Sequence, residues 1–200
     1  EHELLPLTSY NKFKGLCEPI LFENHSRDFI CTNVRPATVC GCSPRMRFDL
    51  SVNILTNLAT RTKEITVFGG KQMRPNLHIN DMCNFYEFLL EADPILIGNK
   101  TFNISDENIS IENLALKIKD IFKKKYNLEV SIKKVESEDD KRSYHLNSDK
   151  IKKELNFSLK YSVDDAINDI YSLLQSKKFD DSLVNNIYYN IKMLKKLKIT

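Results

Sequence analysis

The feature that most constrains the fold of this chain is an alternation of two kinds of segment. Short segments that contain β-branched residues alternate with longer amphipathic segments. The short segments predict strands and lie at 28–36, 64–70, 101–105 and 128–135. The longer segments repeat apolar residues at helical spacing and lie at 10–22, 48–61, 81–92, 110–125, 148–155 and 162–176. Between them we expect a loop at 37–47, a loop with a short strand at 71–81, and a weakly helical tail at 179–200. Strands that alternate with helices indicate an α/β fold.

Several residues have the chemistry of helix caps. Thr8 or Ser9 can cap the first helix, Asn80 or Asp81 the third, and Ser162 the last. Each of these side chains offers an oxygen that can accept a hydrogen bond from an otherwise unpaired N–H group of the first turn.

Composition narrows the class of protein. Two hundred residues suit one domain, or a domain with a small lobe. A hydrophobic content of 42% and a charged content of 28% are ordinary for a soluble globular chain. The net charge of +3 is too small to indicate nucleic acid or membrane binding, and no apolar run reaches the length of a membrane span. The lysine-rich stretch "KMLKKLK" near the end is only a weak signal for nucleic acid.

The cysteines do not form a metal-binding pattern. There are five, Cys17, Cys31, Cys40, Cys42 and Cys83. "CGC" has one residue between its cysteines, and no second pair follows as in a zinc site. Apolar neighbours predict buried, reduced thiols, so we expect a cytoplasmic protein with no metal.

Two tyrosines are each followed four residues later by a lysine: Tyr10 by Lys14, and Tyr188 by Lys192. On a helix such residues share one face. A nearby ammonium favours the phenolate and lowers the tyrosine pKa from its usual value of about 10. The phenol can then exchange a proton with an alcohol while hydride moves to a nicotinamide. The spacing alone favours the plain alternative, an aromatic beside a solvated lysine, so neighbouring segments must decide.

The order of six segments favours the first pair. They are "PLTSYNKFK", "VRPATVCG", "FDLSVN", "ITVFGGKQMRPNLHINDM", "TFNISDENISIENLA" and "DDKRSYHLNSDKIKKELNF". In this order and spacing they resemble the extended short-chain dehydrogenase/reductase family, in its NAD-dependent nucleotide-sugar epimerase/dehydratase branch. The resemblance extends to about Gln175.

The resemblance implies a fold and its division along the chain. It implies the C-terminal part of a Rossmann-like, doubly wound parallel sheet plus a small α/β substrate-binding lobe. Residues 1–47 would belong to the dinucleotide-binding domain, with the tyrosine helix and the next strand. Residues 48–178 would form mainly the substrate lobe, with some segments returning to the sheet, and 179–200 a helical tail.

The resemblance also implies roles. Tyr10 would be the catalytic acid/base and Lys14 its partner on the nicotinamide ribose of NAD or NADP. Pro36 and Ala37 would lie against the nicotinamide. The residues implied at a nucleotide-diphosphate sugar are Thr38, Asp49, Asn53, Phe68, Arg74, Asp140 and Arg142. The pair Tyr188–Lys192 lies outside the resemblance and is assigned no chemistry.

Several of these residues also have plain structural explanations. Pro36 can end a strand, Asp49 can cap a helix, and Phe68 can belong to the core. Arg74 is the strongest binding candidate, because an arginine between a glycine turn and a strand can fork onto a diphosphate. Arg142 could bind the diphosphate, or it could simply belong to a stretch where acidic and basic residues are close together, and the sequence favours neither explanation.

Three other residues near these segments carry weaker signals. Arg45 and Arg47 can add charge over a pyrophosphate or be solvated. His78 lies on an apolar strand, and we interpret it as a hydrogen-bonded structural histidine.

The chain departs from the family in two respects. It contains no G-x-x-G-x-x-G turn and only five glycines, so the N-terminal Gly-rich βαβ unit is absent from this sequence. The family's third catalytic residue, a Ser or Thr well before the tyrosine, has no counterpart in the nine residues before Tyr10. We therefore expect the C-terminal part of a longer enzyme, which by itself binds NAD weakly and is inactive.

The function expected is oxidation of a sugar hydroxyl in a nucleotide-diphosphate sugar by hydride transfer, with Tyr10 as acid/base. The alternative is a non-catalytic module of the same fold that binds a nucleotide or docks a partner. The resemblance also implies a homodimer through the helix from Tyr10 to Phe22. Neither a membrane nor a nucleic acid is expected as a partner.

Overall fold

The computed structural model describes residues 9–136 and 143–199. Its strands are β1 (Thr32–Pro36), β2 (Thr38–Cys40), β3 (Glu64–Phe68), β4 (Met73–His78), β5 (Lys100–Ile104), β6 (Glu107–Ser110) and β7 (Ser131–Val135). Its helices are α1 (Ser9–Glu23), α2 (Ser51–Thr62), α3 (Ile79–Glu91), α4 (Pro94–Ile97), α5 (Ile111–Tyr126), α6 (Asp149–Leu155), α7 (Val163–Leu174) and α8 (Asn190–Lys196), with the 3-10 turns η1 (Lys177–Phe179) and η2 (Asn186–Tyr188). The alternation in the sequence is therefore an α/β fold, as predicted.

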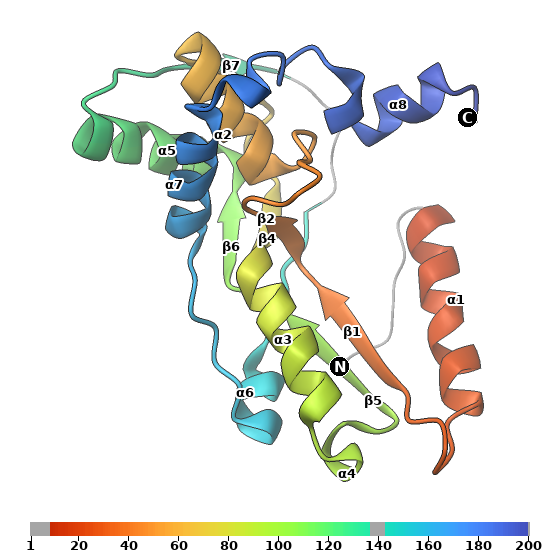
Figure 1. Cartoon of the computed structure of the whole chain (residues 1–200). Helices are drawn as coiled ribbons and strands as arrows, with labels where there is room; N and C mark the ends of the chain where they lie inside the picture. Colours follow the sequence, from red (N-terminus) through yellow and green to blue (C-terminus); the bar gives the residue numbers. More distant parts are fainter. Residues whose placement is uncertain (1–8, 137–142, 200) are drawn as a thin grey trace.

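The strands are mostly parallel. β1 pairs with β5, β2 with β4, and β3 with β7, all in parallel, whereas β4 and β6 are antiparallel. β2 follows β1 almost without a break, and the N–H of Ala37 between them donates to the carbonyl of Ile104 at 2.9 Å. Figure 1 shows α1 standing to one side of β1, with α3 on the other side.

Two hydrophobic clusters hold these elements together. The first lies around α2, α5 and α7, and its fully buried members include Phe48, Leu114, Ile118, Phe122 and Ile167. The second joins α3 and α6 to β1, β4 and β5, and includes Leu77, Phe85, Phe102, Ile104 and Ile151. The helices contribute because one face of each is apolar.

Local signals set the ends of two helices, and the predicted cap at Ser162 is confirmed, whereas Thr8, a candidate cap of α1, lies outside the described residues. Ser162 caps α7 in a capping box, with its hydroxyl accepting from the N–H of Asp165 and the Asp165 carboxylate accepting from the N–H of Ser162. Ser110 caps α5, and Asn127 ends that helix in the left-handed region at φ 53°.

The strand predictions need two corrections. The strand expected at 28–36 begins only at Thr32, because the chain before it turns back so that Ser26 pairs with Phe29. The loop expected at 37–47 contains β2, since Thr38 and Val39 find partners on β4 that the sequence did not reveal.

The cap expected for α3 is also wrong. Neither Asn80 nor Asp81 caps this helix. His78 does, because its Nδ1 accepts a hydrogen bond from the N–H of Asn80 at 3.1 Å. The Asp81 carboxylate instead accepts hydrogen bonds from the backbone N–H groups of residues 160–161.

The cysteines are free, but not all are buried as predicted. Cys31 and Cys40 are buried and Cys42 is half-buried. Cys17 and Cys83 are exposed, because each lies on an outward-facing position of a helix.

The tail after α7 packs on α2 and on the loop before it. The ring of Phe48 meets Phe179 and Tyr188 edge to face, with centroids 6.4 and 5.3 Å apart. The N–H of Phe48 donates to the carbonyl of Tyr188 at 3.0 Å, and Arg61 donates to the carbonyl of Phe179 at 2.8 Å. α8 then projects away from this cluster, toward the side on which α1 stands (Figure 1). Among the described helices, none has both the length and the apolar character that crossing a membrane requires.

Candidate functional site

Tyr10 and Lys14 lie in the first turns of α1, one helical turn apart. The Nζ atom of Lys14 is 5.5 Å from the centre of the Tyr10 ring, so the ammonium and the phenol share a face, as the spacing predicted. Tyr10 is 70% exposed, and no residue of α1 is buried. The pair therefore presents its polar groups to open solvent.

An ion pair that sequence reasoning missed joins this helix to the sheet. Glu18, one turn beyond Lys14, accepts two hydrogen bonds from Arg35 of β1, at 2.8 and 2.6 Å. Two parallel bonds fix the guanidinium and the carboxylate in one plane. The available signal was a single arginine within an otherwise uncharged strand. The pair sets the position of Lys14 relative to the end of β1.

The segment Pro36–Ala37–Thr38 lies at the carboxyl end of β1. Ligands of open α/β sheets bind outside the carboxyl ends of parallel strands. Pro36 ends β1 and is exposed, Ala37 is 6% exposed, and Thr38 is half-buried in register with Asn76. The structural reading of Pro36, strand termination, is confirmed; contact with a nicotinamide stays a prediction for Pro36 and Ala37.

Asp49 and Asn53 are engaged with the protein itself. The Asp49 carboxylate accepts two hydrogen bonds from Arg47, at 2.7 and 3.1 Å, and one from the N–H of Asn190 at 2.9 Å. Burial opposes the charge of this carboxylate, but the bonds from Arg47 and Asn190 outweigh it and lower the Asp49 pKa. Asn53 is buried and bonds to the N–H of Gly41 and the carbonyl of Arg47. Contact of either residue with substrate stays a prediction.

Arg45 and Asp49 both contact the tail. Arg45 donates to the side-chain oxygen of Asn190 at 2.8 Å. Together with the Arg47–Asp49 pair, this contact shows that the two arginines of the loop have partners within the chain.

Phe68 and Arg74 flank a glycine turn. Phe68 ends β3 and is 57% exposed, so it is not a core residue. Gly69 and Gly70 follow with φ of 68° and 105°, values that favour glycine and let the chain turn sharply into β4. Arg74 lies near the start of β4, with its guanidinium 6.0 Å from the ring centre of Tyr144. Asp140 and Arg142 lie outside the described residues.

His78 has the structural role that the sequence suggested. It is buried, caps α3 and stacks on Tyr161 with ring centres 4.8 Å apart. Its Nε2 faces the Asp169 carboxylate at 3.4 Å.

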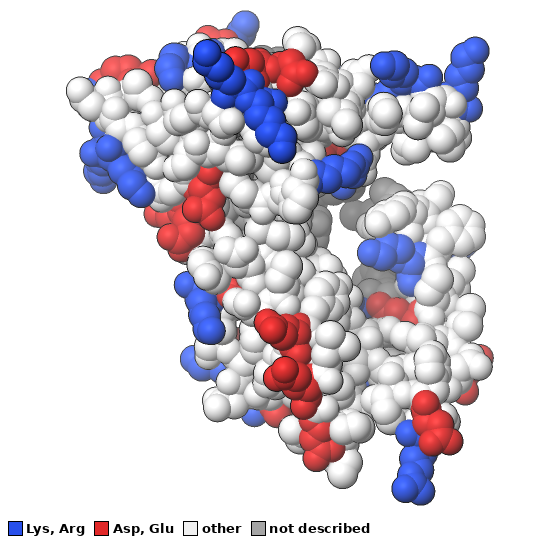
Figure 2. Space-filling view, viewed as in Figure 1, with Lys and Arg blue, Asp and Glu red and all other residues white. Residues whose placement is uncertain are grey.

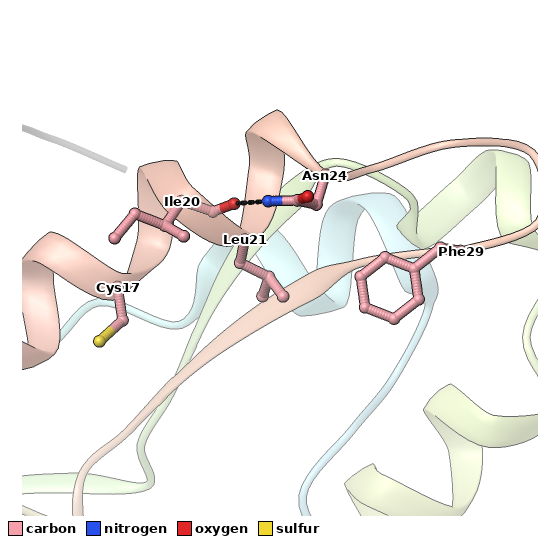
Figure 3. A pocket seen from close by; sticks show the side chains of 5 residues that line it. All are labelled: Cys17, Ile20, Leu21, Asn24 and Phe29. Carbon is pink, nitrogen blue, oxygen red and sulfur yellow. Dashed lines mark hydrogen bonds between the residues drawn. The ribbon is translucent and has the colours of Figure 1, made fainter.

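Two surface cavities lie elsewhere. One, of about 380 Å³, is lined by side chains from the second half of α1 and the turn after it: Cys17, Ile20, Leu21, Asn24 and Phe29 (Figure 3). The other, of about 600 Å³, lies between that turn and α4, and its lining includes His25, Arg27 and Ile95. Neither cavity contains Tyr10, Thr38 or Arg74. On the face shown in Figure 2, lysines and arginines are spread among acidic residues rather than gathered in one patch.

Comparisons with known proteins define the fold. No protein-family model matches the chain. Among solved structures, dTDP-glucose 4,6-dehydratase from Bacillus anthracis in complex with NAD superposes with a TM-score of 0.73 at 19% identity, over 92% of this chain and 57% of that one. UDP-glucuronic acid 4-epimerase from Bacillus cereus, in complex with UDP-glucuronic acid and NAD, gives 0.67 at 24%, over 86% and 54%. RMD from Pseudomonas aeruginosa, complexed with NADPH, gives 0.70 at 15%, over 86% and 58%.

These similarities show that the chain has the fold of part of the Rossmann-like NAD-dependent epimerases and dehydratases. The chain spans little more than half the length of these solved structures.

Proposed function

We propose that this chain carries the catalytic helix and the substrate lobe of an NAD(P)-dependent nucleotide-sugar epimerase or dehydratase of the cytoplasm. The observation that carries the proposal is the Tyr10–Lys14 pair on α1, tied through Glu18 and Arg35 to the strand that ends at Pro36. The fold shared with enzymes that bind dTDP- and UDP-sugars supports it.

In this proposal each residue has a defined task. Tyr10 exchanges a proton with a hydroxyl of the sugar ring, beside Lys14 on the same face of α1. Lys14 also binds the nicotinamide ribose, and Pro36 and Ala37 border the nicotinamide. NAD(P), when bound, supplies the hydride acceptor. The outward-facing phenol and ammonium, both on one face of α1, fit a ribose and a nicotinamide laid against that face.

The nucleotide-diphosphate sugar would lie against the substrate lobe. Arg74, with Arg142, binds the diphosphate, since a guanidinium matches phosphate oxygens with two parallel bonds. Phe68 offers an exposed ring for the base, and Thr38, the first residue of β2, contacts the sugar.

Replacement of Tyr10 tests the catalytic role. We would measure turnover of UDP-glucuronic acid and dTDP-glucose with NAD, in a longer chain that supplies a Gly-rich βαβ unit. Tyr10→Phe removes only the hydroxyl and should lower turnover about 10²- to 10⁴-fold. The matched control is Tyr188→Phe, in the other Tyr-x-x-x-Lys sequence, which should leave turnover unchanged. Full turnover by Tyr10→Phe would contradict the proposal.

A second candidate function is a non-catalytic module that binds a nucleotide. The 70% exposure of Tyr10 favours it, because a phenol in open solvent lacks the enclosed surroundings in which proton transfer is efficient. The same experiment separates the two: a module would bind UDP or dTDP equally well in both variants and turn over in neither.

Cofactor binding and assembly complete the proposal. The 200-residue chain alone should bind NAD weakly or not at all, and micromolar affinity in calorimetry would contradict this. The homodimer would form through α1, which exposes Phe13, Leu16 and Ile20. Sedimentation should give a dimer, and Phe13→Asp should shift it toward monomer.

A further inference from the structure

We propose that Tyr144 is a positioning residue that holds the guanidinium of Arg74 ready for a diphosphate. This inference rests on the proposed function, in which Arg74 binds that group. Nothing in the sequence singles out Tyr144, because it follows Arg74 by 70 residues in a segment without regular secondary structure.

The segment that carries Tyr144 is anchored on both sides of it. Ahead of Tyr144, the hydroxyl of Ser143 accepts a hydrogen bond from the N–H of Met73 at 3.1 Å. Beyond it, the side-chain amide of Asn108 binds Leu146 twice, accepting from its N–H and donating to its carbonyl, both at 2.9 Å. This amide reproduces the paired bonds of a neighbouring strand.

Two further bonds continue the anchoring toward α6. Ser148 donates to the carbonyl of Ser105 at 3.0 Å, and Asn103 donates to the carbonyl of Asn147 at 3.3 Å. From Ser143 to Ser148 the segment is therefore held beside β5 and β6, and it reaches β4 at Met73.

The register of β4 on β6 places Tyr144 beside Arg74. Pro75 lies opposite Asn108, and Arg74 lies opposite Ile109. Met73 binds Ser143 just before Tyr144, and Asn108 binds Leu146 just after it. In the sheet, Arg74 lies between Met73 and Pro75, the residue opposite Asn108, so Arg74 and Tyr144 lie between the same two anchors. The Cζ atom of Arg74 lies 6.0 Å from the Tyr144 ring centre, and its Nη1 donates to the carbonyl of Met73 at 2.9 Å.

Two fixed contacts matter for an arginine that must meet a diphosphate. The ring attracts the cation through its π face, and the carbonyl fixes one edge of the guanidinium. A long side chain otherwise loses rotamer freedom when it binds, which weakens binding. Because the Tyr144 ring lies against Arg74, which binds the diphosphate in the proposed function, the ring should favour ligands with a second phosphate and should have little effect on the base or the first phosphate.

The experiment measures affinities of UDP and UMP for the 200-residue chain by calorimetry, in four variants. Tyr144→Phe keeps the ring and should leave both affinities unchanged. Tyr144→Leu removes the π face and should weaken UDP about three-fold while leaving UMP unchanged. Arg74→Ala should weaken UDP about ten-fold or more and UMP much less. The matched control is Tyr86→Leu. Tyr86 is also an exposed tyrosine but lies on α3, and its replacement should change neither the UDP affinity nor the UMP affinity.

The outcomes separate the inference from the function on which it rests. If Arg74→Ala weakens UDP selectively and Tyr144→Leu does not, the positioning role is wrong and the diphosphate site stands. If Tyr144→Leu weakens UDP and UMP equally, Tyr144 acts on another part of the nucleotide and the inference is overturned. If Arg74→Ala leaves the UDP-to-UMP ratio unchanged, or if the wild-type chain binds no UDP at millimolar concentration, the proposed diphosphate site itself fails. Melting temperatures should be equal for the Tyr144 variants, because this side chain is 44% exposed.

Discussion

The carboxylate of Asp49 accepts the N–H of Asn190, 141 residues away, at 2.9 Å. This bond fastens the tail after α7 to the loop that leads into α2, next to the contact between the backbones of Phe48 and Tyr188. The same carboxylate holds Arg47. One side chain therefore joins the loop before α2 to the tail.

Asp49→Ala should reduce the free energy of unfolding by about 1.5–3 kcal/mol, the usual worth of hydrogen bonds to a charged group. The pKa of Asp49 is lower in the folded chain than in the unfolded one, where it is about 3.9. Its contribution is therefore complete above that value and is lost as the pH falls through the folded pKa. Urea unfolding of both proteins should show a difference at pH 7 that shrinks below about pH 4. If the stability difference between wild type and Asp49→Ala were as large below pH 4 as at pH 7, this account would be contradicted.

Asp81→Asn should be strongly destabilising. Asp81 is fully buried and accepts the N–H groups of Lys160 and Tyr161, at 2.9 Å each at the shortest. In asparagine an NH₂ group replaces one of the two accepting oxygens, so one backbone N–H loses its acceptor. The free energy of unfolding in urea should fall by about 2–3 kcal/mol. The matched control is Asp120→Asn, since this exposed residue pairs with Lys124 one turn away, and its loss should cost at most about 0.5 kcal/mol. Similar losses in the two variants would refute the role of Asp81.

Asp106→Asn should stabilise the chain near neutral pH. Burial, and then the charge of the adjacent Glu107, raise the pKa of Asp106 above its ordinary value. A raised pKa means that the fold prefers the protonated carboxyl, so the wild type loses stability as the pH rises from the unfolded pKa of about 3.9 through the folded value. The asparagine, which has no charge, should therefore be more stable than the wild type at pH 7 and no more stable at pH 3. Thermal unfolding at the two pH values measures this, and a loss at pH 7 would disprove it.

The cysteines should divide by reactivity. Burial, together with the charge of Asp106, raises the pKa of Cys40 to about 12, and burial raises that of Cys42 to about 11. Because the thiolate is the reactive form, iodoacetamide at pH 8 should alkylate the exposed Cys17 and Cys83 and spare Cys40 and Cys42. Mass spectrometry after a short exposure detects this, and in urea all five should react. Early alkylation of Cys40 would show that its surroundings are open.

Sequence reasoning identified most helices because their signals are local. The apolar spacing of α5 and α7, and the cap of α7 at Ser162, depend only on residues within a few positions of one another. The same holds for the shared face of Tyr10 and Lys14, which is a consequence of helical geometry.

The sequence by itself therefore determined the α/β class, the main helices, and the residue types that the proposed chemistry requires. The tertiary structure decided which groups meet. In the folded chain β2 pairs with β4, and Asp81 accepts hydrogen bonds from the backbone of residues 160–161. Glu18 forms an ion pair with Arg35, and the Arg74 guanidinium lies over the Tyr144 ring. Each of these contacts joins residues distant along the chain, and their partners are chosen by the packing of whole elements, which no local pattern records.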